Sequence, residues 1–272
     1  MSREQGEYVL GTEAVELERL GLQHQLWLAQ AASAWERARF RRGHRILDVG
    51  CGPGFAALDL AERLGPSGQV VAVDISRRFL EHLEAMAKAR GLTNIRTRVS
   101  SVERLLMKES GFDGAYARWV LCFVRRPAAV LTQVARRLKR GGRFVIQDYY
   151  RYESITVAPQ SEAFRRVFRA VHQSWRARGG DPDVGCRLPG LLERAGFEIE
   201  DLQPIVRLAR PGSALWDWPD TFFDIYLPTL VKTGFINATD EKAFRRDWAK
   251  RSRDKGAFFT SPPMVEIIAV KK

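Results

Sequence analysis

Short apolar runs alternate with segments of helical periodicity through the middle of the chain. Three of the five apolar runs end in an acidic residue or are followed by glycine, and apolar positions recur between the runs at the three- and four-residue spacing of a helix face. The predicted strands are residues 45–49, 69–74, 95–99, 112–117 and 143–148, and the predicted helices are 55–64, 77–90, 101–108 and 125–139. This order predicts an α/β fold with a mostly parallel, Rossmann-like sheet covered by helices on both faces.

The segments that flank this region follow other patterns. Residues 10–39 carry leucine, alanine and tryptophan at near-helical spacing, which predicts an N-terminal helical layer. After Asp148 the pattern predicts helices at 160–178 and 187–195 and strands at 197–208 and 264–270. We therefore expect four units: a helical lid at 1–40, a core at 41–208 with a helical insertion at about 155–186, an aromatic-rich cap insertion at 209–262, and a final core strand at 263–272.

The composition is that of a globular protein. Of the 272 residues 45% are hydrophobic, which is enough to build a core. No window approaches the roughly 18 apolar residues of a membrane-spanning helix, and the polar first residues lack the apolar stretch of a signal peptide. We therefore expect a cytoplasmic protein without membrane insertion. The spacing of Cys51, Cys122 and Cys186 forms neither a disulfide framework nor a zinc-binding pair, so no metal is predicted.

The chain is strongly basic, with 44 Lys and Arg against 32 Asp and Glu, a net charge of +12 and a pI near 10.0. Such a balance suits nucleic acid, an anionic membrane surface or an acidic small ligand. Most of the 35 arginines lie in helix-like stretches, and no basic arm or stacking-aromatic motif accompanies them. Solvated helix faces explain this pattern equally well, so charge alone does not decide the function.

The most specific motif is the sequence LDVGCGPG at residues 47–54, a strand that runs into a glycine-rich turn before a helix. Glycines in such a turn let the backbone approach a ligand closely. Asp74 ends the next strand, 20 residues after Gly54, where a carboxylate can accept the ribose hydroxyls of an adenosine. The third glycine comes one residue earlier than in the dinucleotide fingerprint, which disfavours a nicotinamide-dependent oxidoreductase.

With these motifs the sequence resembles the class I S-adenosyl-L-methionine (SAM)-dependent methyltransferases. The resemblance rests on residues 49–54, 73–76 and 138–142, and it is closest to the small-molecule branch with quinone and natural-product methyltransferases. Residues 8–11 with Glu18, Arg19 and Leu20 are similar to an N-terminal lid segment of that branch. The family implies a seven-stranded sheet with an antiparallel last strand. It also implies SAM as cofactor and S-adenosyl-L-homocysteine as product.

The resemblance assigns a set of cofactor-binding residues to the carboxyl ends of the first strands. These are Asp48, Gly50, Cys51, Gly52, Gly54, Asp74, Ile75, Ser101, Val102 and Arg118. Ser101 stands where the family often has an aspartate beside the adenine, and a helix N-cap is an equally good reading of it. Asp48 either contacts the ligand or orients the loop.

Three residues are candidates for the chemistry: Asp148, Arg118 and Tyr8. Asp148 would accept a proton or fix an amine, or else be a solvated strand-end carboxylate. Arg118 would pair with the SAM carboxylate, with an acidic substrate, or with a surface acid. Tyr8 would close over SAM or simply pack. Phe123 stands where the family often has a histidine, so no histidine base is predicted there.

Methyl transfer requires mainly alignment and desolvation, because the sulfonium donor is already activated. We therefore expect an in-line displacement by a small, aromatic or heteroaromatic acceptor enclosed by Tyr149, Trp216, Trp218 and Phe222. The same rings would serve equally as the core of a cap.

Two further hypotheses stay open. The first is an RNA or DNA methyltransferase that uses the basic surface. Against it, no Asn/Asp-Pro-Pro-aromatic motif follows the fourth strand, so we expect no specific nucleic-acid partner. The second is a non-catalytic SAM-binding scaffold. The sequence does not indicate the oligomeric state.

Overall fold

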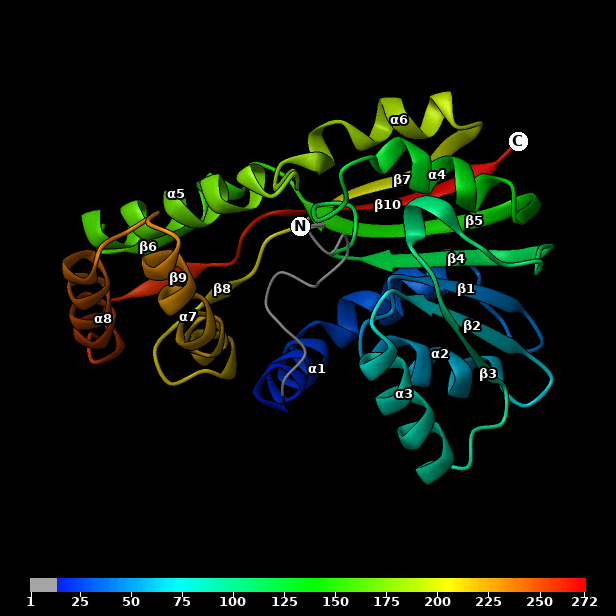
Figure 1. Cartoon of the computed structure of the whole chain (residues 1–272), viewed down its shortest axis with the longest axis horizontal. Helices are drawn as coiled ribbons and strands as arrows, with labels where there is room; N and C mark the ends of the chain where they lie inside the picture. The colour runs from blue at the N-terminus through cyan, green and yellow to red at the C-terminus, as the bar shows by residue number, and fades with distance from the viewer. Residues whose placement is uncertain (1–13) are drawn as a thin grey trace, which may run out of the picture.

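The computed structural model describes residues 14–272, and a seven-stranded sheet forms its centre (Figure 1). The sheet consists of β1 (Arg45–Val49), β2 (Gln69–Asp74), β3 (Ile95–Val99), β4 (Phe112–Arg118), β5 (Leu138–Tyr149), β7 (Phe197–Ile205) and β10 (Met264–Lys271). The strand order is β3-β2-β1-β4-β5-β10-β7. β10 runs opposite to the other six strands, and all pairs that do not include it are parallel. The predicted seven-stranded, mostly parallel sheet with an antiparallel last strand is confirmed.

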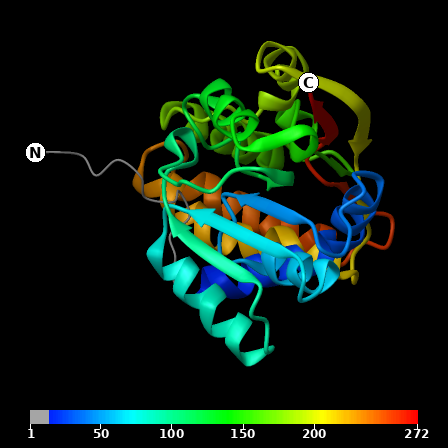
Figure 2. The same cartoon turned by 90° about the vertical axis from the view of Figure 1, so that its right-hand side faces the viewer.

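Helices cover both faces of this sheet, as the view in Figure 2 shows. The second half of α1 (Ala14–Arg37), α2 (Phe55–Leu64) and α3 (Arg77–Ala89) pack on one face, around buried residues such as Ile46, Leu60 and Leu83. On the other face lie α4 (Pro127–Ala135) and α6 (Leu188–Arg194). Both faces of the central strands are therefore buried, which explains their continuous runs of valine, isoleucine and alanine. Within residues 14–272, no helix is long and apolar enough to cross a membrane.

A second unit, which we call the cap, lies beyond the carboxyl ends of the parallel strands (Figure 1). It contains α5 (Glu162–Ala177), α7 (Ala214–Lys232), α8 (Ala238–Ser252) and a small sheet of β6 (Thr156–Ala158), β9 (Phe258–Thr260) and β8 (Leu208–Ala209). Its interior is aromatic: Phe164 stacks on Phe168 with ring centres 4.3 Å apart, and Trp216 on Trp248 at 4.7 Å. Segments that are separate in the sequence thus share one core.

Helix α1 lies between the cap and the sheet. The Trp27 ring packs edge-on against Trp119 of the core and against Trp218 of the cap, with ring centres 5.8 Å apart in both pairs. The Arg207 guanidinium lies over the same ring, 5.2 Å from its centre, and donates to the Leu26 carbonyl. The N-terminal helix therefore forms part of both units. The domain boundaries expected at residues 40, 208 and 262 stay predictions.

Four details differ from the predicted elements. The helix predicted at 125–139 ends at Ala135, and β5 already begins at Leu138 and not at 143. The helix predicted at 101–108 is wrong: only one 3₁₀ turn, Val102–Arg104, forms there, because the Ser100 hydroxyl accepts from the Leu106 amide and donates to the Arg104 carbonyl. The strand predicted at 197–208 is divided between β7 and β8, where the chain leaves the main sheet for the cap. The small sheet and the 3₁₀ turns Tyr152–Ser154 and Val184–Cys186 are not predicted by the periodicity.

Candidate active site

A cleft of about 1090 Å³ opens at the carboxyl ends of β1, β2 and β4. β1 pairs with both β2 and β4, so the chain order reverses there, and α/β sheets bind ligands at this switch point. Nearly all predicted cofactor residues line the cleft: Asp48, Gly50, Cys51, Gly52, Asp74, Ile75, Ser101, Val102 and Arg118. Gly54 is the exception. A Cβ atom at Gly54 would lie 2.4 Å from a methyl carbon of Leu83, so this glycine allows α2 and α3 to pack closely.

Gly52 and Asp74 form the bottom of the cleft together. Gly52 has a left-handed backbone with φ +54°, and apart from its chain neighbours no described residue has an atom within 4 Å of the position where its Cβ would stand. Asp74 accepts hydrogen bonds from the amides of Gly52 and Ser76, at 2.9 and 2.8 Å. Burial raises the pKa of Asp74, and these amides oppose the rise. A carboxylate has about four acceptor positions, so this one can also accept two adjacent ribose hydroxyls.

Asp48 is a buried carboxyl with an unpartnered oxygen. Its side chain lines the cleft, and its Oδ2 atom has no hydrogen-bond partner within residues 14–272. Burial raises the pKa of Asp48 to about 7, which the positive charge of Arg118 opposes. A buried acceptor of this kind is costly unless a ligand donates to it. The ammonium group of SAM is such a donor, so the residues of the cleft fit this cofactor.

Arg118 is held in the cleft by a histidine that the motifs do not indicate. Its Nη2 donates to Nδ1 of His24 at 2.7 Å, and Nε2 of His24 lies 2.7 Å from the Asp59 carboxylate. Because an arginine only donates, His24 must accept at Nδ1 and carry its proton at Nε2. Burial lowers the pKa of His24, which favours this neutral form. The orientation of Arg118 is therefore set from inside the protein.

Ser101 has the N-cap role that its sequence context allows. Its hydroxyl accepts from the Glu103 amide at 3.3 Å, at the start of the 3₁₀ turn. Ser101 also lines the cleft, so capping and ligand contact are compatible. Ile75 lines the cleft as well and is 43% exposed, which is unusual for a large apolar residue and suits an adenine ring.

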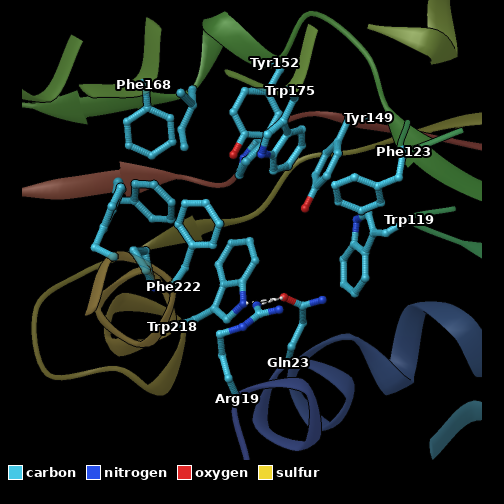
Figure 3. Close-up of a pocket in the computed structure, with 15 residues that line it drawn as sticks. Arg19, Gln23, Trp119, Phe123, Tyr149, Tyr152, Phe168, Trp175, Trp218 and Phe222 are labelled. Atoms are coloured by element: carbon cyan, nitrogen blue, oxygen red, sulfur yellow. Dashed lines mark hydrogen bonds between the residues drawn. The ribbon is translucent and has the colours of Figure 1, made fainter. Parts of the chain in front are cut away.

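A second cavity, the aromatic pocket, adjoins the cleft (Figure 3). Its volume is about 50 Å³, and of the fifteen residues within 14–272 that line it, ten are aromatic. The two cavities share four lining residues: Gln23, Trp119, Phe123 and Trp175. The wall of the pocket comes from α1, the loop after β4, the end of β5, and the cap.

The predicted acceptor residues divide into two groups. Tyr149, Trp218 and Phe222 line the aromatic pocket, and Trp218 donates from its indole nitrogen to Gln23 Oε1 at 3.0 Å (Figure 3). Trp216 does not line it. Its ring is 1% exposed, stacks on Trp248 and donates to the Ser252 hydroxyl at 3.0 Å. The geometry thus places Trp216 in the core of the cap and does not favour an acceptor contact.

Asp148 is fully engaged in backbone contacts. It is 1% exposed, and its carboxylate accepts from the amides of Leu121, Cys122 and Tyr149 at 2.7, 3.2 and 2.9 Å. Burial raises the pKa of Asp148 to about 6. It lines neither cavity, so the geometry favours a positioning role for the loop after β4 over proton transfer. Tyr8 lies outside the described residues.

Several site residues are missing from the sequence-based set. Arg19, Gln23 and His24 of α1 line the cavities, as do Trp119, Tyr152 and Trp175. One signal for the first two exists in the sequence. Arg19 and Gln23 precede Trp27 by eight and four residues, so they share its apolar helix face, where a polar side chain needs a reason.

Comparisons with known proteins identify the family of this chain. Residues 40–208 match the family model described as a methyltransferase domain. A demethylmenaquinone methyltransferase of Lactococcus lactis is 34% identical over 66% of this chain and 75% of its own. Methyltransferase GfsG of Streptomyces halstedii is 28% identical over 74% and 68%. Geranyl diphosphate C-methyltransferase of Streptomyces coelicolor, solved with S-adenosyl-L-homocysteine, superimposes with a TM-score of 0.59 at 16% identity, covering 94% and 84%.

The extent of these matches differs. Some other curated relatives match over only about half of their own length, from 44% to 53%. The family model nevertheless covers the glycine-rich turn, Asp74 and Arg118, which line the cleft. The chain therefore belongs to the class I SAM-dependent methyltransferases, in the small-molecule branch of that family, with SAM as its cofactor.

Proposed function

We propose that this protein transfers the methyl group of SAM to a small, largely apolar, aromatic or heteroaromatic acceptor in the aromatic pocket. The observation that carries the proposal is the wall shared by the two cavities. Trp119, Phe123 and Trp175 each line both, so a ring in the pocket would adjoin the cofactor cleft. The demethylmenaquinone methyltransferase of Lactococcus lactis, by its name, acts on a ring compound, which supports this class of acceptor.

The residues of the cleft would hold the cofactor at several points. Asp74 would accept the ribose hydroxyls, Asp48 would accept from the ammonium group, and Arg118 would pair with the carboxylate. Ile75 would pack on the adenine ring. When bound, SAM supplies an activated methyl group on a sulfonium.

The pocket would contribute alignment and exclusion of water. Its rings give an acceptor few orientations, and bringing two reactants into line can account for about 7–11 kcal/mol of a barrier at the upper end. The described residues that line it include no Asp, Glu or His. Binding and orientation by the rings, rather than proton transfer by the pocket, would therefore support an in-line displacement.

Crystallography of the complex with S-adenosyl-L-homocysteine tests the proposal. We expect the sulfur to face the shared wall of Trp119 and Phe123, with the aromatic pocket open beside it. Incubation with methyl-labelled SAM and a set of small phenols and heteroaromatics should then label at least one of them. If the rings pack away from the sulfur and leave no cavity beside it, a macromolecular substrate at an open cleft becomes the better account.

A further inference from the structure

Two buried phenol hydroxyls face the aromatic pocket. Tyr149 and Tyr152 are 6% and 3% exposed, and both line the pocket. Neither hydroxyl has a hydrogen bond to another residue of 14–272, and neither oxygen is among the fully buried atoms that lack a partner, so both stay accessible from the pocket to a ligand. Figure 3 shows both oxygens directed toward the interior of the pocket. Unpartnered hydroxyls in this position indicate a ligand with a polar atom.

A buried cation faces these hydroxyls from α1. Arg19 is 4% exposed and lies on the opposite wall in Figure 3. Its guanidinium donates twice to Glu16, at 2.7 and 2.6 Å, and once to Gln23 at 2.9 Å. Burial raises the pKa values of Tyr149 and Tyr152, and the positive charge of Arg19 opposes this rise. The three groups therefore act on the same small volume.

The described residues of the pocket offer the acceptor no base. The described lining of the pocket contains no carboxylate or imidazole, Glu16 is paired with Arg19, and Asp148 is bound to three backbone amides. A neutral phenol or enol would find no base among these residues of 14–272, yet a nucleophile needs an available electron pair. An acceptor that is already ionised meets this requirement.

We propose that the acceptor binds as an oxyanion, a phenolate or an enolate conjugated with its ring, whose oxygen lies among Arg19, Tyr149 and Tyr152. The inference rests on the proposed function, since it assigns the acceptor class of the same pocket. The acceptor's proton passes to solvent before binding. Its electron pair then forms the bond to the methyl carbon, and the sulfur keeps the pair of the broken C–S bond. Whether the oxygen or a conjugated carbon attacks, the methylated product is neutral.

The charges balance in this arrangement. Glu16 and Arg19 cancel each other, so the pocket alone would not hold a full negative charge strongly. The sulfonium of SAM, bound in the cleft, would add one positive charge to the neighbourhood of the pocket. We therefore expect an oxyanion to bind more tightly when a positively charged ligand occupies the cleft. The hydrogen bonds of the pocket would add to this preference.

Binding of 4-nitrophenol tests the proposal, because its anion is yellow and its neutral form is colourless. The matched control is 4-nitroanisole, which has a methyl group in place of the acidic proton. With sinefungin, a positively charged SAM analogue, in the cleft, we expect the pKa of bound 4-nitrophenol to fall by about one unit or more, equivalent to about tenfold preference for the anion. We also expect 4-nitrophenol to bind at least about tenfold more tightly than 4-nitroanisole near pH 8.

Paired substitutions identify the groups responsible. The double variant Glu16→Gln with Arg19→Gln removes both charges together, so no unpaired charge is buried. It also removes the guanidinium that would donate to the oxyanion, and we expect the preference for the anion to fall about tenfold. Tyr149→Phe with Tyr152→Phe keeps both rings and should produce a similar loss, which covers the case in which the first pair fails to fold. Arg165→Gln removes an exposed guanidinium of α5 that pairs with Glu162 and does not line the pocket, and it should leave the anion preference unchanged.

The outcomes separate the two proposals. If both compounds bind equally well and the colour titrates without a shift, the pocket holds neutral rings. The proposed function then survives and the oxyanion is excluded. If neither compound binds while sinefungin does, the pocket does not accept such rings and both proposals fail. If both double variants still prefer the anion, groups other than Arg19, Tyr149 and Tyr152 bind it, and the inference is also overturned.

Discussion

The cleft and the aromatic pocket adjoin each other but are built in different ways. The predicted cofactor-binding part of the cleft is formed by a glycine-rich turn and by strand ends, and its two carboxylates, Asp48 and Asp74, lie within about 30 residues of each other in the sequence. The pocket is formed by side chains from α1, β5, α5, α7 and β9, which span most of the sequence. A cleft of the first kind serves one cofactor in a whole family, whereas a pocket of the second kind can change its ligand by exchange of single rings.

The sharpest separation of the two regions should come from Asp74→Ala. It removes the acceptor of the ribose hydroxyls and the partner of the Gly52 amide, and each charge-assisted hydrogen bond contributes about 1.5–3 kcal/mol. We expect the affinity for S-adenosyl-L-homocysteine, measured by calorimetry, to fall at least about tenfold. Asp224→Ala, which removes an exposed carboxylate of the cap, is the control. Unchanged affinity in Asp74→Ala would refute this cofactor site.

Trp218→Ala should have the opposite profile. Its ring lines only the pocket, so turnover of an acceptor should fall about tenfold or more while cofactor affinity stays within about twofold. Trp216→Phe is the control for Trp218→Phe. Both variants exchange an indole of α7 and affect the stability of the cap, but only Trp218 lines the pocket. Equal losses of kcat/KM in the two variants would contradict an acceptor role for Trp218.

The buried carboxyl of the cleft should appear in the pH dependence of stability. Burial raises the pKa of Asp48 to about 7 from 3.8, so the folded state binds the proton more tightly than the unfolded state. Stability without cofactor should therefore decrease as pH rises between these values. Asp48→Asn should raise the melting temperature more at about pH 8 than at about pH 5, by about 2–4 °C for each kcal/mol regained. A larger gain at the lower pH would show that the sign is wrong.

The smallest expected effect concerns the basic surface. If the small pocket is the acceptor site, the charge of +12 gives only nonspecific attraction to nucleic acid. Binding of mixed tRNA, followed by filter retention, should be weak and should be lost between low and physiological salt. Salt-resistant, sequence-selective binding, or methyl incorporation into total RNA, would instead favour a nucleic-acid substrate.

The same contrast explains how far the sequence could predict this molecule. The strands at 45–49, 69–74 and 95–99 have the predicted bounds, because short apolar runs between turns are local signals. The pocket has no such signal. Trp216 and Trp218 lie two positions apart on α7, so they point to different sides of the helix, and only the packing decides which one faces the pocket.

Local hydrogen bonds limited the prediction in a second way. The apolar spacing after Ser100 is compatible with a helix, but the Ser100 hydroxyl binds backbone groups that a helix would use itself. Asp148 presents the same problem for function. A carboxylate at a strand end looks catalytic in sequence, and only the three amides that surround it indicate a bracing role.

Two neighbouring residues of α1 form hydrogen bonds in different cavities. Gln23 accepts from Trp218 in the wall of the pocket, and His24 accepts from Arg118 in the cleft. A change in the position of this helix therefore alters both sites at once. If the cofactor tightens acceptor binding by fixing α1, thermodynamic linkage requires the acceptor to tighten cofactor binding by the same factor. We therefore expect any cooperativity between cofactor and acceptor to pass through this one turn of α1, without the movement of a domain.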